Sequence, residues 1–128
     1  KIFYDAQGPN GNGEEWSLET GRGYVSENLG DCSFVAVDEH IQKILGFCLG
    51  SVATYEKGRE LLIQMIAVHP ENQRSSIGTL LYEKLVEEAK IRNCTGMRLV
   101  AKQGHYSYSW YEKIGFNQTG YVEMYKSI

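Results

Sequence analysis

The sequence predicts a mixed α/β fold, in which antiparallel strands lead into a β-α-β crossover. Residues 61–68, LLIQMIAV, are apolar apart from Gln64, as expected of a strand that is covered on both faces. The helix that follows is predicted by an apolar stripe at every fourth residue, formed by Ile77, Leu81, Leu85 and Ala89. Apolar segments before residue 55, separated by short polar turns, predict the antiparallel strands.

The other elements follow from local patterns. Residues 14–29 are ambiguous, because apolar residues at helical spacing are interrupted by Gly21 and Gly23. Gly46 and Gly50 lie within a predicted strand, where they allow twist or a close approach. Pro70 ends the apolar strand, because proline has no N–H to donate. The expected elements are strands at 32–37, 41–54, 61–68 and 97–101, turns at 38–40 and 56–59, helices at 77–92 and 107–114, and a final strand or hairpin at 116–126.

Composition limits the class of protein. The 128 residues predict one domain, 1–128, and a hydrophobic content of 42% is ordinary for a globular protein. A net charge of −3 argues against a nucleic-acid partner, and no apolar run approaches the roughly 18 residues of a membrane helix. The first residues, KIFYDAQG, resemble no signal peptide and lack an initiator methionine. The cysteines are far apart, so we expect reduced thiols, a cytoplasmic protein and no metal site; they are Cys32, Cys48 and Cys94.

A polar turn joins the apolar strand to the helix. The turn reads Gln73-Arg74-Ser75-Ser76-Ile77-Gly78, and the first helical turn carries no acidic residue. Backbone N–H groups that open a helix can bind an anion, and the helix dipole favours negative charge there. Because Arg74 adds a positive charge, the turn predicts a site for a pyrophosphate.

This turn resembles the signature of the GNAT superfamily of acyl-CoA-dependent N-acyltransferases, [Q/R]-x-x-G-x-[G/A] after an apolar strand. Gln73 and Gly78 match the signature, and Ser76 replaces its first glycine. Two readings of Ser76 stay open. Glycine is needed if this position has a positive φ, whereas serine is favoured if it is the helix N-cap.

A second segment, residues 110–116, WYEKIGF, resembles the F/L-Y-E-K-x-G-F segment of the same family. It predicts a short helix that ends at a left-handed Gly115, with Phe116 folding back onto the last turn. Ser109 and Glu112 have the spacing of a capping box, and Ser107 is an equally good start. The resemblance covers roughly residues 32–116. Both ends depart from the family pattern, so the N-terminal part is expected to be incomplete and the acceptor side is not carried over.

The resemblance implies transfer of an acetyl group from acetyl-CoA to a primary amine of a small molecule or a peptide, by direct attack in a ternary complex without a metal. It implies no nucleic-acid or membrane partner, and a homodimer is compatible with it. The backbone of Ile66 and Val68 is expected to pair with the pantetheine, and Val68 N–H to stabilise the oxyanion. The pyrophosphate is expected to be bound by the turn residues Gln73, Arg74, Ser75, Ser76, Ile77, Gly78 and Thr79.

Tyr111 corresponds to the family's tyrosine near the CoA sulfur, which makes it the expected acid for the leaving thiolate. Because tyrosine has a pKa near 10 and a thiol one near 8.5, we expect a hydrogen bond to the developing charge rather than a complete proton transfer. Some family members carry a glutamate base where this chain has Leu62. Glu60 lies two residues before Leu62, so the two side chains point to the same face of a strand, and Glu60 is the expected base. His69, His105 and bulk-connected water are the alternatives.

Four further tyrosines are expected to act as half-buried packing residues, with an acceptor pocket as the alternative, namely Tyr106, Tyr108, Tyr121 and Tyr125. In the family many members carry an asparagine at the position of Tyr106. Two other functions stay open. One is a non-catalytic acyl-CoA-binding regulatory domain, and the other is an interaction protein that keeps only the fold.

Overall fold

The structure is a computed structural model that describes residues 14–73 and 75–128. A four-stranded sheet has the order β1-β2-β3-β4, with antiparallel β1/β2 and β2/β3 pairs and a parallel β3/β4 pair. The expected mixed sheet is confirmed. Its elements are α2 (Leu18–Glu27), β1 (Phe34–Asp38), β2 (Lys43–Tyr55), β3 (Gly58–Val68), the 3₁₀ turn η1 (Pro70–Asn72), α3 (Ile77–Ile91), β4 (Gly96–Leu99) and α4 (Tyr106–Lys113).

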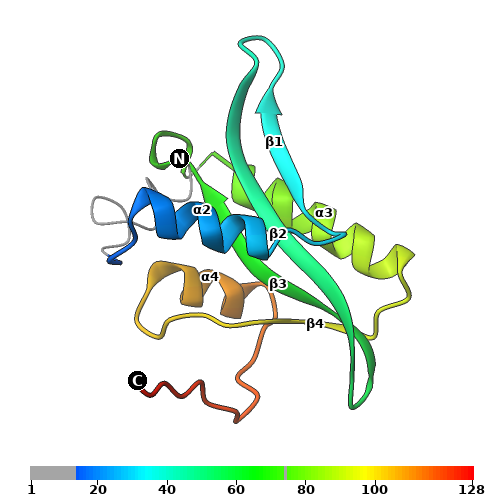
Figure 1. The fold of residues 1–128 in the computed structure, drawn as a ribbon. Helices are drawn as coiled ribbons and strands as arrows, with labels where there is room; N and C mark the ends of the chain where they lie inside the picture. Colours follow the sequence, from blue (N-terminus) through cyan, green and yellow to red (C-terminus); the bar gives the residue numbers. More distant parts are fainter. Residues whose placement is uncertain (1–13, 74) are drawn as a thin grey trace.

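The helices cover both faces of the sheet. Figure 1 shows α2 and α4 in front of the sheet and α3 behind it. The parallel pair β3/β4 is connected through α3, which confirms the predicted β-α-β unit. The expected site segments, which are the end of β3, the start of α3 and all of α4, therefore belong to consecutive elements of this unit.

The ambiguous segment 14–29 contains a helix. Ser17 caps α2 by accepting a hydrogen bond from Thr20 N–H, and the Thr20 side chain accepts one from Ser17 N–H. This reciprocal pair satisfies donors that a helix start otherwise leaves unpaired. Gly21 is the buried residue of α2, so the glycine that made the segment ambiguous lies where the helix packs.

The β2–β3 hairpin is tighter than expected. Tyr55 pairs with Gly58, so that β3 begins three residues before the expected start at Leu61. Gly58 has a φ of +130°, a conformation that L side chains rarely adopt. The expected turn at 56–59 is thereby reduced to Glu56 and Lys57.

A β-bulge interrupts the pairing of β2 with β3. Leu49 pairs with Met65 and Gly50 pairs with Ile63, which leaves Gln64 without an opposite residue. A bulge of this kind shifts the alternation of side chains along the strand. Gly50 is required here, because a Cβ at this position would lie 2.9 Å from the carbonyl oxygen of Cys32. The expectation that Gly50 allows a close approach is confirmed.

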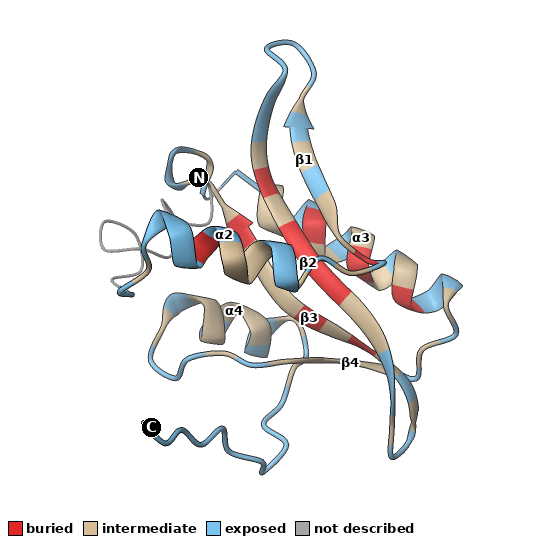
Figure 2. Cartoon of the chain, viewed as in Figure 1, coloured by how far each residue is buried: buried red, intermediate tan, exposed pale blue. Residues whose placement is uncertain are grey.

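The core lies between the sheet and α3. Figure 2 shows buried residues concentrated on β2, β3 and the side of α3 that meets them. The expected stripe of α3 is confirmed, since Leu81, Leu85 and Ala89 are buried and Ile77 packs against them.

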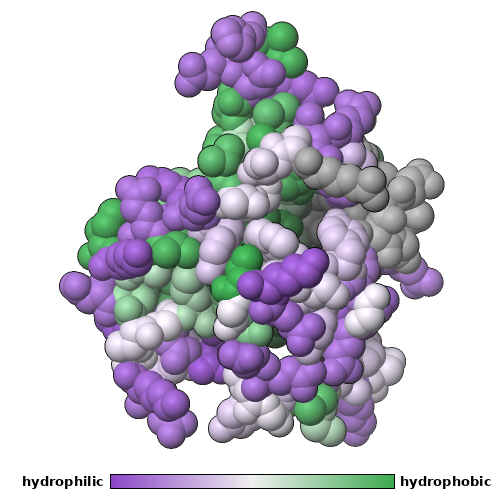
Figure 3. All heavy atoms as spheres, turned by 180° about the vertical axis from the view of Figure 1, so that it is seen from behind, coloured by the Kyte–Doolittle hydropathy of each residue, from purple (hydrophilic) through white to green (hydrophobic). Residues whose placement is uncertain are grey.

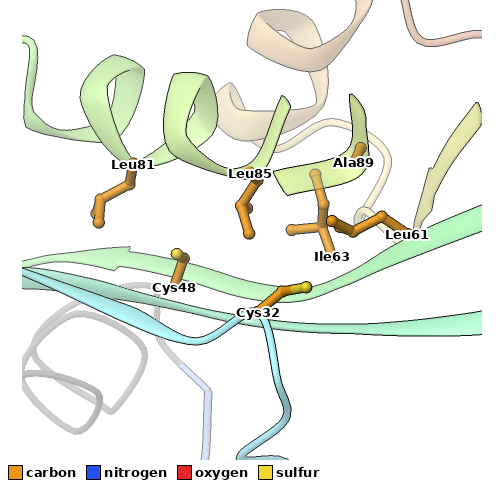
Figure 4. Packing of buried hydrophobic residues seen from close by; sticks show 7 residues of the cluster. All are labelled: Cys32, Cys48, Leu61, Ile63, Leu81, Leu85 and Ala89. Carbon is orange, nitrogen blue, oxygen red and sulfur yellow. The ribbon is translucent and has the colours of Figure 1, made fainter. Parts of the chain in front are cut away.

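Figure 3 shows the face of the protein that is hidden in Figure 1. This face is mostly hydrophilic, and hydrophobic residues gather on it below the tip of the β1–β2 hairpin. Figure 4 shows the three α3 side chains pointing at Cys32, Cys48, Leu61 and Ile63 on the opposite layer. Across the described part of the chain, no helix combines the length and apolar character needed to span a bilayer.

The expected final strand at 116–126 is wrong. Residues 116–128 contain no helix or strand, and in Figure 1 they leave the body of the protein as an extended tail. Tyr121 and Tyr125 are 85% and 91% exposed, so neither packs nor lines a pocket. The apolar pattern alone predicted a strand, but a strand also needs a partner for its backbone, and no described strand pairs with this segment.

Candidate functional site

The β3–β4 ladder ends before β3 does. Its last pair joins Ile63 to Leu99, whereas β3 continues to Val68. On the other side, β2 still pairs with Val68 through Gly46. Residues 64–68 therefore present a backbone edge that no strand in the described part of the chain covers. This divergence also ends β4 at Leu99 rather than at the expected residue 101.

Two N–H groups point toward this open edge. His69 N–H donates to the carbonyl of Leu45 at 2.9 Å, which marks a hydrogen-bonded pair of the β2–β3 ladder. Hydrogen-bonded and non-hydrogen-bonded pairs alternate in an antiparallel ladder. The neighbouring Val68 therefore directs its N–H away from β2, and Ile66 does the same. These are the two residues whose backbone the sequence selected as a pairing edge.

A cavity of about 150 Å³ lies between the open edge and α4. Residues 63–66 of β3 and 99–102 at the end of β4 line one side of it. The other side is lined by His105, Tyr106, Ser107 and Tyr111. The structure thus brings Tyr111 and the backbone of Ile66 to one cavity, although they are far apart in the sequence.

The way α4 ends fixes the position of Tyr111. Phe116 N–H donates to the carbonyl of Tyr111 at 3.0 Å, and Gly115 N–H donates to that of Glu112 at 3.1 Å. With φ of +106° at Gly115, these bonds form a Schellman motif. The ring of Phe116 returns to pack edge-on against Tyr111, with 5.6 Å between centroids. The expected glycine cap and the return of Phe116 are confirmed.

An aromatic cluster joins α4 to α3. The ring of Tyr82 on α3 lies 5.8 Å from Trp110 and 6.2 Å from Phe116, both edge-on. Edge-to-face pairs at these distances add a favourable quadrupole interaction to the apolar burial. Through Phe116, the cluster extends to Tyr111. The position of Tyr111 is therefore set by α3 as well as by its own helix.

The hydroxyl of Tyr111 is available to a ligand. Tyr111 lines the cavity, and its hydroxyl forms no hydrogen bond with any residue that the structure describes. Burial, and to a smaller extent the nearby Tyr106, raises the pKa of Tyr111 from 10.0 to about 12. The group therefore stays protonated at neutral pH and can donate a hydrogen bond.

The start of α4 differs from both expectations. The N-cap is His105, neither Ser107 nor Ser109, and no side chain caps the helix. The hydroxyl of Ser107 instead lies 3.2 Å from His105 Nδ1. The capping-box spacing of Ser109 and Glu112 does not mark the start, because both residues lie inside the helix.

The start of α3 is open to an anion. Residues 77–79 form its first turn, which contains no acid and receives no side-chain cap. The loop before it is held from the strand side, because Gln73 Nε2 donates to the carbonyl of Val68 at 3.3 Å and the Ser75 hydroxyl donates to the carbonyl of Asn72. Arg74 lies outside the described residues.

Ser76 resolves the two readings left open by the sequence. It occupies the N-cap position of α3, yet its φ of 69° is left-handed and its side chain makes no capping hydrogen bond. The expectation that its hydroxyl favours the cap is therefore wrong. The position needs the backbone that glycine adopts at least cost, which explains why the family signature has glycine there.

Gly78 is not required for packing. A Cβ at this position would lie 3.8 Å from Val68 Cγ2, an ordinary van der Waals contact. The absence of a side chain thus leaves open backbone beside Val68, at the point where the open edge of β3 meets the start of α3.

Glu60 does not reach the cavity. Its carboxylate accepts a hydrogen bond from Arg98 Nε at 2.8 Å, and its side chain is 12% exposed. It lies six residues before Ile66, about 20 Å along the strand at roughly 3.3 Å per residue. The ion pair and this position give Glu60 a structural role between β3 and β4, and we do not retain it as the base.

The alternative bases lie in different places. His69 follows β3, where its Nδ1 accepts a hydrogen bond from Glu71 N–H, and it does not line the cavity. His105 does line the cavity, beside Tyr106. Tyr106 is 63% exposed at the cavity rim, and Tyr108 is half-buried.

Two residues of the site gave no signal in the sequence. Glu14 lines the cavity, and its carboxylate accepts a hydrogen bond from Trp16 Nε1 at 2.7 Å. Tyr24 on α2 bonds to the bulged Gln64. Both come from the ambiguous N-terminal segment, where no motif marks a position.

A larger cavity, of about 650 Å³, lies between α2 and strands β1 and β2. Its walls are almost entirely apolar, and none of the site residues predicted from the sequence line it. Cys48 is part of its wall, and burial raises the pKa of this thiol to about 11. Among the described residues there is no group of three or more His, Cys, Asp or Glu side chains that would hold a metal.

The profile of the acetyltransferase (GNAT) family matches residues 4–116. The chain belongs to this family. No curated protein sequence matches this GNAT family member significantly. Among solved structures, a putative acetyltransferase from Pyrococcus furiosus is 23% identical with a TM-score of 0.73, over 90% of this chain and 82% of that one.

Two further structures resemble this GNAT protein. An integron cassette protein from the mobile metagenome of V. cholerae is 20% identical with a TM-score of 0.65, over 75% of this chain and 60% of that one. An aminoglycoside N-acetyltransferase in complex with CoA is 18% identical with a TM-score of 0.64, over 74% of this chain and 65% of that one. The chain thus spans less than two thirds of these two proteins, and such identities show a shared fold.

Proposed function

We propose that this GNAT family member transfers an acetyl group from acetyl-CoA to a primary amine, by direct attack in a ternary complex. The observation that carries the proposal is the open edge of β3. Its free N–H groups at Ile66 and Val68 lead from the cavity at Tyr111 to the uncapped start of α3. An extended ligand that ends in a pyrophosphate matches both parts of this path.

The start of α3 is the proposed pyrophosphate site. Backbone N–H groups of the first turn supply donors, and the absence of an acid leaves the positive end of the helix dipole uncompensated. Arg74 belongs to the proposal through its place in the sequence. The residues proposed to contact the phosphates are Gln73, Arg74, Ser75, Ser76, Ile77, Gly78 and Thr79.

The chemistry needs a donor for the oxyanion and a proton for the sulfur. As the amine nitrogen attacks the thioester carbon, Val68 N–H would stabilise the developing oxyanion. As the carbon–sulfur bond breaks, the Tyr111 hydroxyl would donate to the leaving thiolate. None of the described residues that line the cavity is a cysteine, which supports direct transfer over an acyl-cysteine intermediate.

His105 is the proposed base, in place of Glu60. Imidazole exchanges a proton near neutral pH, and His105 lies in the same cavity as Tyr111. Its Nδ1 lies 3.2 Å from the Ser107 hydroxyl oxygen. If Nδ1–H donates to Ser107, Nε2 is left unprotonated and can accept a proton from the substrate ammonium, directly or through a water, before the free amine attacks.

The test is a screen of small amines and peptides with acetyl-CoA, read by release of free thiol. We expect release that depends on both the amine and the protein. CoA binding by calorimetry, measured in parallel, separates the outcomes. Binding without thiol release from any amine would favour a non-catalytic acyl-CoA-binding domain, and the absence of binding would reject both functions. A reduced cytoplasmic setting is part of the proposal, since all three cysteines are free thiols.

A further inference from the structure

The bulge at Gln64 determines which N–H groups reach the open edge. Before the bulge, Leu61 and Ile63 are buried in the core cluster beside α3. After it, Ile66 and Val68 pack against the same cluster, so the alternation has shifted by one residue. If the bulge moved along the strand, the N–H groups of residues 65 and 67 would replace those of 66 and 68 at the open edge.

Tyr24 holds this bulge from α2. Its hydroxyl donates to the backbone carbonyl of Gln64 at 3.3 Å and accepts from the Gln64 side-chain amide at 3.1 Å. Both bonds fall on the residue that the β2–β3 ladder leaves unopposed. The side chain and the main chain of one residue are thus fixed by a single hydroxyl.

Tyr24 is itself well placed as an anchor. It is half-buried, and its ring packs edge-on against Trp16 with 5.3 Å between centroids. Trp16 in turn donates to Glu14 at the cavity. The anchor therefore lies next to the site without lining the cavity, and a change of its hydroxyl leaves the cavity wall in place.

We propose that Tyr24 is a positioning residue, whose hydroxyl locks the bulge at Gln64 so that the N–H groups of Ile66 and Val68 face the acyl-CoA. The inference rests on the proposed function for its catalytic consequence. The locking itself is a property of the ligand-free protein, and it is testable without activity.

The first test is hydrogen exchange of ligand-free protein with Tyr24→Phe, which removes only the hydroxyl. We expect exchange of the Met65 and Ala67 amides, whose N–H groups face β2, to become about tenfold faster, the effect of losing one or two net hydrogen bonds. Exchange in residues 59–63 should not change. Tyr55→Phe is the matched control, because it removes a tyrosine hydroxyl at the far end of β2. Equal exchange in parent and Tyr24→Phe proteins would overturn the proposal.

The second test separates positioning from general destabilisation. Tyr24→Phe should weaken CoA binding about tenfold and leave unchanged the affinity for ADP, which keeps the pyrophosphate and lacks the pantetheine. An equal loss for both ligands would overturn the proposal. If the parent protein binds neither ligand, the proposed function fails while the exchange result still decides the role of Tyr24. Gln64→Ala, which removes only the side-chain bond, should give a smaller change in exchange and provides a second variant if Tyr24→Phe does not fold.

Discussion

Arg98 Nε donates to the Glu60 carboxylate at 2.8 Å, and the guanidinium carbon of Arg98 lies 4.4 Å from the centroid of the Tyr55 ring. Glu60 and Arg98 thereby link β3 and β4 at the end of the ladder that lies away from Tyr111. The Glu60 carboxylate, which the sequence suggested as a base, is instead bonded to Arg98 on the neighbouring strand. A base is therefore expected among the residues that line the cavity, not at this ion pair.

Glu60→Gln should retain acetyl transfer, whereas His105→Gln should reduce kcat. Loss of general base assistance typically costs about 10²–10⁴-fold. Glu60→Gln should lower the free energy of unfolding, because it removes the charge from the carboxylate that accepts from Arg98 Nε. Steady-state kinetics over a range of pH check both variants. A large loss of kcat in folded Glu60→Gln would contradict the assignment and restore Glu60 as the base.

Gly78→Ala should make the protein more stable and a poorer binder of CoA. The added methyl has room against Val68, and alanine restricts the unfolded chain more than glycine does, which stabilises a protein by about 0.4–1 kcal/mol. The same methyl lies where the phosphates would approach the backbone, so we expect the affinity for CoA to fall about tenfold or more. Thermal melts and calorimetry measure the two effects.

Gly23→Ala is the matched control for this variant, since Gly23 lies in α2 and a Cβ there meets nothing within 4 Å. It should raise stability without changing CoA affinity. Gly78→Glu should abolish binding by adding a negative charge. Unchanged CoA affinity in folded Gly78→Glu would remove the proposed phosphate site.

Ser76→Gly should stabilise the protein by about 1 kcal/mol, because a left-handed backbone costs a non-glycine residue about 1–2 kcal/mol. Affinity for CoA should change by less than about 1 kcal/mol, since the backbone N–H groups stay in place. Ser76→Ala keeps the left-handed strain and should bring no such gain. A loss of stability in Ser76→Gly on chemical denaturation would show that the hydroxyl, not the backbone, matters here.

Tyr111→Phe should lower kcat by about 10²–10⁴-fold with little change in the Kd for acetyl-CoA, because the ring remains and only the proton donor is lost. The loss should shrink for an acyl donor with a better leaving group. A thermal melt must show that the variant is folded. Parent-like kcat in that folded variant would make Tyr111 a packing residue.

Tyr111 also predicts a pH dependence of stability. Burial raises its pKa from 10.0 to about 12, so the folded protein holds the proton more tightly than the unfolded chain. The resulting stabilisation is complete below pH 10 and is lost as the pH rises toward 12. By pH 11 the parent should have lost about 1.4 kcal/mol from this group. Chemical denaturation of the parent and of Tyr111→Phe at pH 9 and pH 11 isolates the contribution of Tyr111. The contribution of Cys48 cancels in this comparison, because Cys48 titrates in both proteins.

The sequence was sufficient where one local pattern decides the structure. The four-residue stripe of α3 and the Gly115 cap of α4 are both local, and both were predicted correctly. The bulge was not predictable, because LLIQMIAV has no polar alternation whose shift would mark it. The start of α4 was misplaced because two serines matched a cap equally well, and a contact between Ser107 and His105 took up one of them.

The site was predictable in part for the same reason. Motifs marked Tyr111 and the first turn of α3 as candidates, and the places of both follow from the chain order of β3, α3 and α4. The proposed roles of His105 as base and of Tyr24 as positioning residue depend on contacts that no local sequence pattern marks. Glu60 was selected because its side chain shares a face of the strand with Leu62, but this pattern does not give its distance from the cavity along the strand. Tyr24 lies in a segment whose glycines made the helix ambiguous in the sequence.

The aromatic cluster of Tyr82, Trp110 and Phe116 has a consequence for how a ligand is held. The helix α4 has 8 residues, and an isolated helix shorter than about 12 is marginal in water. Its order therefore depends on the rings that fasten it to α3. Local opening of α4 would carry Tyr111 away while the sheet stays folded. A ligand that contacts both α3 and Tyr111 binds only the closed form, so its affinity should rise with any change that tightens the cluster.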